Sequence, residues 1–230
     1  MKFGVIVFPG SNCDRDMATI TQGILGEPTR MVWHQDTDLG DLDVVIVPGG
    51  FSYGDYLRCG AIARFSPVMN SIIEHAKAGK YVLGVCNGFQ VLTEVGLLPG
   101  ALIRNRDLHF ICDRVPVKVE RSDTVWTSNY TSGKVVTYPI AHGEGRYYAE
   151  ADTLKTLEDN NQVLFRYCSA TGEVDEANNP NGSLNNIAGI INQQGNVLGM
   201  MPHPERAADR ALGNTDGLAM FEGLVSTITV

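Results

Sequence analysis

Three short apolar runs in the first hundred residues restrict the fold more than any other feature of this sequence. They read FGVIVF (residues 3–8), DVVIVPGG (residues 43–50) and YVLGV (residues 81–85). Runs without polar alternation are typical of strands that are covered on both faces. Helical patterns at residues 11–26 and 66–79 separate them, and this order predicts a parallel sheet with right-handed crossovers.

The second half of the chain is richer in strand patterns and poorer in helices. Its strand-like runs are VPVKVE, KVVTYPIA, VLFRYC, IAGIIN and VLGMM, and a final helical pattern covers Leu218–Ile228. We expect some of these strands to extend the sheet and others to form a β-rich flap. The predicted fold class is therefore α/β, an open, mostly parallel sheet with helices on both faces, built as a single domain over residues 1–230.

Charge and cysteine content narrow the function classes. Eighteen basic and 26 acidic residues give a formal net charge of −8, which disfavours binding to the phosphate backbone of nucleic acids. No apolar run approaches the roughly 18 residues that cross a bilayer, so we expect no membrane span. Five cysteines occur without a CxxC pair. This pattern is typical of thiols in a reducing compartment, and we expect a cytoplasmic location.

The string GVCNG, residues 84–88, joins the third apolar run to a helical pattern. Its G-x-C-x-G spacing is that of a nucleophile elbow with sulfur in place of oxygen. In such an elbow the nucleophile has a strained backbone, and its neighbours are glycine because strand and helix approach closely. The spacing therefore predicts that Cys86 is a nucleophile at the carboxyl edge of the sheet. The alternative is an inert, buried structural cysteine.

The groups around Cys86 suit chemistry at a carbonyl carbon. The helix that begins near Asn87 turns its positive end toward the thiol, which favours the reactive thiolate. The backbone N–H of Asn87 faces a developing oxyanion, and a second donor would come from Gly49 or Gly50 at the end of the neighbouring strand. Loss of one such donor typically costs roughly 3–4 kcal/mol of transition-state stabilisation.

A thiol nucleophile needs a base, and the chain has five histidines, at positions 34, 75, 109, 142 and 203. His203 is the best candidate, because it follows an apolar strand and Glu205 is near enough to orient its imidazole. His142 lies among glycines and suits the lining of a pocket. We expect His34 to be solvated beside an acidic loop and His75 to interact with the carboxyl end of its helix.

Metal and nucleotide motifs are weak or absent. His109 and Cys112 form a single HxxC pair, which is weak evidence for zinc. The acidic loop after His34 lacks the glycine and final glutamate of a calcium loop. Two Gly-Lys pairs, at residues 79–80 and 133–134, lack the upstream glycine and the following Ser/Thr of a P-loop. We therefore predict no metal site and no cofactor in this chain.

Longer sequence blocks give these candidates a family context. GVCNGFQVLTEVGLLPGAL carries Cys86, and NPNGSLNNIAGIINQQGNVLGMMPHPER carries His203 and Glu205. With FPGSNCDRD and VPGGFSYGDYLRCGAIAR, these blocks make almost the whole chain resemble the class I (triad) glutamine amidotransferases. The resemblance is closer still to the standalone glutaminase subunits of phosphoribosylformylglycinamidine synthase, because GGFSYGDYLRCGAIAR separates these subunits from other amidotransferases.

The resemblance implies a role for each site residue. Cys86 would attack the side-chain amide of glutamine, and His203 would move the proton that releases ammonia. Glu205 would orient His203, and water would hydrolyse the glutamyl thioester to glutamate. The resemblance assigns the oxyanion hole to the backbone amides of Gly50 and Asn87. It assigns a substrate contact to the side chain of Gln90.

The resemblance also implies partners. A large synthetase subunit, joined by a small accessory subunit, would receive the ammonia through an internal tunnel. With ATP and Mg²⁺ it would convert formylglycinamide ribonucleotide to formylglycinamidine ribonucleotide in de novo purine synthesis. We expect the segment Ser52 to Arg64, with Tyr56 and Arg58, to contact the synthetase, because aromatic residues and arginine are enriched at interfaces. We also expect the isolated chain to be nearly inactive until a partner completes the oxyanion hole.

Two other classes fit parts of the pattern. A cysteine α/β-hydrolase of the dienelactone hydrolase kind also combines G-x-C-x-G with a late histidine, but its acid precedes the histidine, as Asp175 would. A chaperone or sensor of the ThiJ/PfpI-like fold has an oxidisable elbow cysteine. That class gives no reason for Gln90 or for the pairing of His203 with Glu205. The acid that contacts His203 therefore discriminates between these alternatives.

Overall fold

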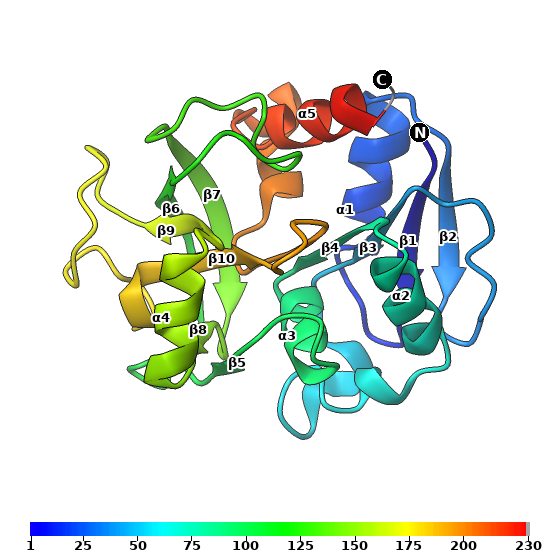
Figure 1. The fold of residues 1–230 in the computed structure, drawn as a ribbon, viewed down its shortest axis with the longest axis horizontal. Helices are drawn as coiled ribbons and strands as arrows, with labels where there is room; N and C mark the ends of the chain where they lie inside the picture. Colours follow the sequence, from blue (N-terminus) through cyan, green and yellow to red (C-terminus); the bar gives the residue numbers. More distant parts are fainter. Residues whose placement is uncertain (229–230) are drawn as a thin grey trace.

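A nine-stranded sheet organises the protein in the computed structural model, which describes residues 1–228 (Figure 1). In chain order its strands are β1 (Phe3–Val7), β2 (Thr29–Trp33), β3 (Val44–Val47), β4 (Tyr81–Val85), β6 (Ile111–Val119), β7 (Val135–His142), β9 (Val163–Tyr167), β10 (Ile187–Ile191) and β11 (Val197–Met200). Their order across the sheet is β2-β1-β3-β4-β11-β10-β9-β6-β7. A separate antiparallel pair consists of β5 (Ala101–Ile103) and β8 (Arg146–Tyr148).

The predicted α/β class is confirmed, with a parallel half that strands of the second half extend. Strands β2, β1, β3, β4 and β11 are parallel neighbours, whereas β10, β9, β6 and β7 continue the sheet in antiparallel order. The three apolar runs of the first half form β1, β3 and β4, and the five runs of the second half all lie in strands. The functional edge of the sheet therefore belongs to its parallel half.

The helices are α1 (Asp14–Ala18), α2 (Val68–Lys77), α3 (Asn87–Glu94), α4 (Ala151–Asp159) and α5 (Leu218–Ile228). A π-helical turn, η1 (Thr19–Ile24), continues α1, and short 3₁₀ turns are η2 (Ser52–Asp55), η3 (Ala63–Phe65), η4 (Leu184–Asn186), η5 (Pro204–Ala207) and η6 (Arg210–Leu212). In the strand order, β2 lies on one side of β1, whereas β4 lies on the opposite side of β3. The crossovers β1–α1–β2 and β3–α2–β4 therefore run in opposite directions across the sheet. Right-handed crossovers therefore place α1 and α2 on opposite faces.

The sheet is the centre of one hydrophobic core. All four residues of β3 are fully buried, as expected for a strand covered on both faces, and each such side chain contributes about 1.5–3 kcal/mol by leaving water. The predicted final helix has the bounds of α5. Among residues 1–228, none of the helices is both long and apolar enough to cross a membrane.

Several local predictions were wrong. The helical pattern predicted over residues 11–26 is not one regular helix, because α1 changes to a π-helical turn at Thr19. His34 is buried rather than solvated, and its Nδ1 lies 2.7 Å from the hydroxyl of Tyr53. His75 lies in the last turn of α2 as expected, and it is buried there, which lowers the pKa of its imidazole.

Candidate active site

Three neighbouring parallel strands end at one edge of the sheet and bring the predicted residues together. Cys86 directly follows β4, whose last residue, Val85, pairs with Met200 at the end of β11. His203 lies three residues beyond Met200. The strand β3 pairs with β4 on the other side and leads into Gly49 and Gly50. Strand order alone therefore places His203 and the glycine pair on the two sides of Cys86.

The backbone at Cys86 has the predicted elbow geometry. Its φ of 53° and ψ of −109° lie in a region that residues with side chains rarely adopt, and such strain costs about 1–3 kcal/mol. A Cβ on Gly84 would overlap the side chain of Leu92 and the backbone of Gly88. A Cβ on Gly88 would overlap the carbonyl oxygen of Val47. Both glycines are therefore needed because α3 packs directly on β3 and β4.

His203 and Glu205 form a buried pair beside the elbow. His203 Nδ1 lies 2.6 Å from Glu205 Oε1. Burial acts against the charged imidazole, but the negative charges of Glu205 and Cys86 outweigh it, so the pKa of His203 is raised well above its ordinary value. The opposite ring nitrogen, Nε2, is buried and makes no hydrogen bond to a nitrogen or oxygen within the described chain, while the thiols of Cys13 and Cys86 interact with the imidazole. The geometry therefore leaves Nε2 available for proton transfer.

Cys13 is a second buried thiol at the same imidazole. A side chain on Gly49 would contact His203 Cε1 at 2.8 Å, Cys13 Sγ at 3.1 Å and Cys86 Cβ at 3.3 Å, so these three residues surround one point. Arg206 Nη2 donates to Cys13 Sγ at 3.1 Å. Burial raises the pKa of the Cys13 thiol, although His203 acts in the opposite direction.

The sequence contains a signal for Cys13 that is topological rather than a motif. Cys13 lies six residues after β1, which is a parallel neighbour of β3. Parallel strands bring their carboxyl ends to one edge, so the loop after β1 belongs beside the loops after β3 and β4. In the sequence, only the G-x-C-x-G spacing distinguishes Cys86 from Cys13 as the candidate nucleophile.

The glycine pair after β3 has a defined orientation. The carbonyl oxygen of Gly49 accepts hydrogen bonds from the backbone N–H groups of Asn12 and Cys13, at 3.3 and 3.2 Å. Across the planar peptide, the N–H of Gly50 points away from that loop. The φ of Gly50 is 140°, and a Cβ there would lie 2.5 Å from Asn12 N and 2.8 Å from Ser11 Cα. Glycine is therefore required at this position.

Asn87 and Gln90 form a polar wall at the start of α3. Asn87 Nδ2 donates to Gln90 Oε1 at 2.9 Å, and Gln90 Nε2 donates to the carbonyl oxygen of Glu144 at 2.6 Å. The Oδ1 of Asn87 accepts from both the N–H and the hydroxyl of Ser52. These bonds tie the helix to η2 and to the loop after β7, the two segments that flank the elbow.

The strand β7 lies over the site. It is the last strand of the main sheet, so the expectation that some of the five second-half runs form a separate flap is wrong. The N–H of His203 donates to the carbonyl oxygen of Pro139 at 2.8 Å, and Cys86 Sγ lies 3.8 Å from the carbonyl oxygen of Ala141. Only 6% of the surface of Cys86 is exposed. The nucleophile is therefore at the sheet edge, as predicted, but more enclosed than the elbow motif alone suggests.

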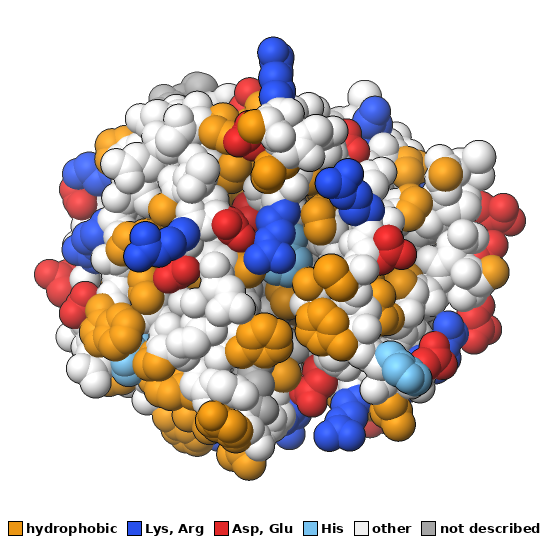
Figure 2. All heavy atoms as spheres, turned by 180° about the vertical axis from the view of Figure 1, so that it is seen from behind, with side chains coloured by type: hydrophobic (Ala, Val, Ile, Leu, Met, Phe, Trp, Pro, Cys, Tyr) orange, Lys and Arg blue, Asp and Glu red, His pale blue; other side chains and the backbone are white. Residues whose placement is uncertain are grey.

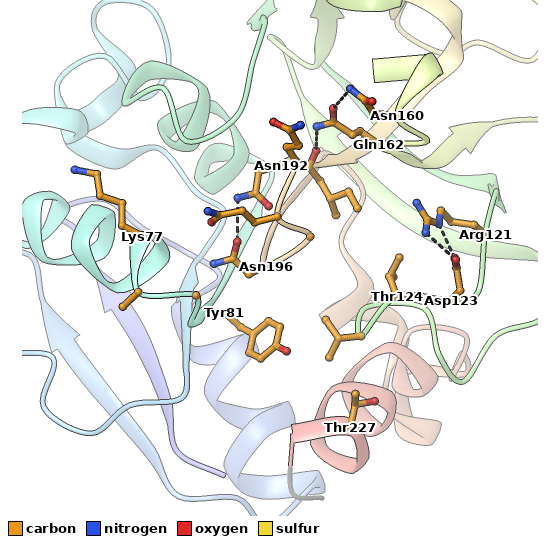
Figure 3. Close-up of a pocket in the computed structure, with 17 residues that line it drawn as sticks. Lys77, Tyr81, Arg121, Asp123, Thr124, Asn160, Gln162, Asn192, Asn196 and Thr227 are labelled. Carbon is orange, nitrogen blue, oxygen red and sulfur yellow. Dashed lines mark hydrogen bonds and ion pairs between the residues drawn. The ribbon is translucent and has the colours of Figure 1, made fainter. Parts of the chain in front are cut away.

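A large pocket lies elsewhere, where β4, β9 and β11 begin (Figure 3). Several of its amide groups contact one another or the backbone. Gln162 Nε2 donates to the carbonyl oxygen of Ile191 at 2.8 Å, and Asn192 Nδ2 donates to Asn196 Oδ1 at 3.0 Å. The residues that line this pocket include none of the predicted site residues. We therefore assign the chemistry to the enclosed elbow.

Comparisons with known proteins agree with this geometry. A family of CobB/CobQ-like glutamine amidotransferase domains matches residues 1–218. Phosphoribosylformylglycinamidine synthase subunit PurQ of Synechocystis sp. is 75% identical over 220 residues, which cover 96% of this chain and 98% of that protein. The corresponding subunit of Trichormus variabilis is 71% identical over 228 residues, which cover 99% and 98%. The chain belongs to the PurQ family of glutamine amidotransferases.

The PurQ fold has also been seen within a complex. The structure of PurLQS from Thermotoga maritima superposes on this chain with a TM-score of 0.87 at 41% identity, covering 99% of this chain and 98% of that one. The predicted family and fold class are thus confirmed. The hydrolase and sensor alternatives are wrong. Glu205, not Asp175, contacts His203, and Asp175 instead accepts hydrogen bonds from Asn178.

Proposed function

We propose that Cys86, His203 and Glu205 are the triad with which this PurQ-family chain hydrolyses L-glutamine to glutamate and ammonia. The observation that carries the proposal is the buried His203–Glu205 pair, 2.6 Å between Nδ1 and Oε1, beside an elbow cysteine in a glutamine amidotransferase. Glu205 accepts the Nδ1 hydrogen and fixes the ring orientation. Nε2 is then directed at the reacting groups.

In the proposed mechanism, Cys86 gives its thiol proton to His203, and Sγ attacks the carboxamide carbon of glutamine. The negative charge that develops on the oxygen is stabilised by the backbone N–H groups of Gly50 and Asn87. His203 gives its proton to the leaving nitrogen, and ammonia departs from a glutamyl thioester. His203 then takes a proton from water as the water attacks the thioester, and returns it to Sγ, which releases glutamate and the free thiol. Gln90 would help to hold the substrate, and its carboxamide also contacts Asn87 and the carbonyl oxygen of Glu144.

We further propose that the ammonia passes to a synthetase subunit with a small accessory subunit, in a complex like PurLQS. The partner would use ATP and Mg²⁺ to convert formylglycinamide ribonucleotide to formylglycinamidine ribonucleotide. This chain would supply nitrogen alone and hold no cofactor of its own. The cytoplasmic location stays a prediction.

The surface beside η2 is the proposed contact with the synthetase. Figure 2 shows hydrophobic side chains gathered at the bottom of the molecule, and Figure 1 places residues 51–65 at that end. Tyr56 is 87% and Leu57 is 67% exposed, and Phe51 packs on Phe110 at the same surface. Arg58 instead donates to Glu94 at 2.6 and 2.8 Å, so it holds the segment against α3.

Covalent trapping tests the proposed function. An electrophilic glutamine analogue, followed by mass spectrometry, should modify Cys86. Glu205→Gln should lower kcat for glutamine hydrolysis by roughly 10²–10⁴-fold, because the imidazole loses its orienting carboxylate, whereas Asp175→Asn should leave it unchanged. Modification of another cysteine, or a larger loss in Asp175→Asn, would contradict the assignment.

The isolated chain should hydrolyse glutamine far more slowly than the assembled complex. We propose that partner binding completes the oxyanion hole by acting on the segment between Gly50 and Arg58, which hydrogen-bonds to α3. Measuring kcat with and without the synthetase and accessory subunits tests this point. Full turnover by the isolated chain, unchanged by the partners, would show that the site is already complete.

A further inference from the structure

His142 is a buried histidine near the proposed triad that the mechanism above leaves unused. It ends β7 and follows Ala141, whose carbonyl oxygen lies 3.8 Å from Cys86 Sγ. Only 3% of its surface is exposed. Its imidazole lies against Gly145, where any side chain would overlap the ring atoms Cε1, Nδ1 and Nε2. The backbone therefore holds the ring in one place.

Asn105 determines which nitrogen of His142 carries the hydrogen. Asn105 Nδ2 donates to the carbonyl oxygens of His109 and His142, both at 2.8 Å, which fixes the orientation of the amide. Its Oδ1 then accepts from the N–H of Gly145 at 3.0 Å and lies 3.1 Å from His142 Nδ1. Because a carbonyl oxygen only accepts, Nδ1 carries the hydrogen and Nε2 is a bare acceptor.

This acceptor lacks a partner in the described part of the chain. Nε2 of His142 is buried and makes no hydrogen bond there, and leaving such a group unsatisfied costs about 1–3 kcal/mol. Burial, together with the positive charge of His203, lowers the pKa of His142 to about 4. The ring is therefore neutral at physiological pH. A neutral, fixed acceptor in an enclosed site is complementary to an N–H group of a ligand.

We propose that His142 Nε2 accepts a hydrogen bond from the carboxamide N–H of bound glutamine. The proposal rests on the proposed function and deepens it. We assign the donor to the carboxamide of glutamine rather than to its α-ammonium group, because His142 lies beside the reacting groups. Its neighbour Ala141 reaches Cys86 Sγ, and the charge of His203 acts on its ring.

This contact would distinguish substrate from product. The carboxamide of glutamine offers N–H donors, whereas the carboxylate of glutamate offers only lone pairs. Two facing lone pairs repel, so Nε2 would favour glutamine and help glutamate to leave. Asn105 is then a positioning residue, since it sets the tautomer that makes the selection.

Two substitutions of His142 test the proposal in the assembled complex. His142→Asn keeps an N–H near the position of Nδ1 and removes Nε2, whereas His142→Gln places a carbonyl group near the position of Nε2. We expect His142→Asn to raise KM for glutamine roughly tenfold, with no weakening of inhibition by glutamate. His142→Gln should recover part of the affinity for glutamine. The rate at which iodoacetamide labels Cys86 reports whether the site is intact in each variant.

The ratio of the affinities for glutamine and for glutamate decides the outcome, because loss of a merely structural residue would weaken the binding of both ligands. Equal losses for glutamine and glutamate would overturn the assignment, as would an unchanged KM in both variants. In these cases the wild-type complex still hydrolyses glutamine, so the proposed function stands. A wild-type complex that releases no glutamate from glutamine would overturn the proposed function and this proposal with it.

Discussion

Cys86 and Cys13 lie at the same imidazole, yet their surroundings differ. Cys86 has the strained φ of 53° at the start of α3, whereas Cys13 Sγ accepts a hydrogen bond from Arg206. The strained elbow is the feature that suits a nucleophile. Cys13 instead fills space beside His203 and fixes Arg206.

Exchange of each cysteine for alanine separates the two thiols. Cys86→Ala should abolish glutamine hydrolysis in the complex, because no nucleophile remains. Cys13→Ala should retain activity within roughly tenfold, because it changes only the packing and electrostatics around His203. Release of glutamate, quantified in a coupled assay, is the measurement. Activity in Cys86→Ala combined with none in Cys13→Ala would reverse the assignment.

The buried, neutral state of His142 predicts a stability change with pH. Its pKa is about 4 in the folded chain and 6.5 in the unfolded chain, so between these values the unfolded state binds more protons. The stabilisation is complete above pH 6.5 and is lost as pH falls toward 4, by about 3 kcal/mol in total. Urea unfolding across this range should show a smaller loss for His142→Asn than for the wild type. The exposed substitution His109→Asn is the control and should follow the wild type.

Single site residues could be predicted from the sequence where a local motif contains them. The elbow spacing identified Cys86, and the short separation of His203 and Glu205 identified the pair. Cys13 and Asn105 were missed, because their importance arises from contacts across the fold. Asn105 contacts His142 and Gly145, some forty residues along the chain, and no local pattern records such a contact.

The element that positions the elbow is α3, whose first turn packs against β3 and β4. Gly88 is the point of closest approach, since a Cβ there would overlap the carbonyl oxygen of Val47. Backbone atoms of a central strand cannot move aside as a flexible side chain can. The motif therefore predicts the two glycines, and the structure shows that the backbone of Val47 is what excludes a side chain at Gly88.

Gly88→Ala should destabilise the chain by about 1–3 kcal/mol, because the added methyl group forces α3 away from the sheet. The expected readout is a lower urea midpoint together with slower labelling of Cys86 by the glutamine analogue. Gly23→Ala is the matched control. Gly23 is exposed in η1, and a Cβ there meets only Thr19 Cγ2 at 3.9 Å, so this change should alter stability by less than about 1 kcal/mol. Equal effects would refute the packing argument.

Elements were predicted where several apolar residues are buried in a continuous or alternating pattern, and missed where only one residue is buried. The runs that became β1, β3 and β4 are apolar at nearly every position. Strand β2 was missed because it is an edge strand in which only Val32 is buried. Helix α4 was missed because only Leu157 of its nine residues is buried, which leaves almost no apolar face. Exposed elements carry little of the periodicity on which such predictions depend.

At the scale of the whole molecule, the sheet connects the two halves of the chain. Its order places β11, from the end of the sequence, directly beside β4. The single-domain organisation over residues 1–230 stays a proposal, supported by this sheet and by one continuous core. The pairing of β11 with β4 also brings His203 to Cys86, so the proposed site exists only when both halves are folded together.

The same organisation leaves the hydrophobic surface beside η2 next to the site, where a synthetase would receive ammonia. Leu57→Ala should weaken assembly with the synthetase and accessory subunits by roughly 5–30-fold in Kd, because a central apolar contact contributes about 1–2 kcal/mol. Leu212→Ala is the matched control, since Leu212 is 53% exposed in η6, a different part of the chain. Calorimetric titration of both variants measures the difference. If the two variants bound the partners equally well, the surface beside η2 would not be the interface, and ammonia would have to leave by another face.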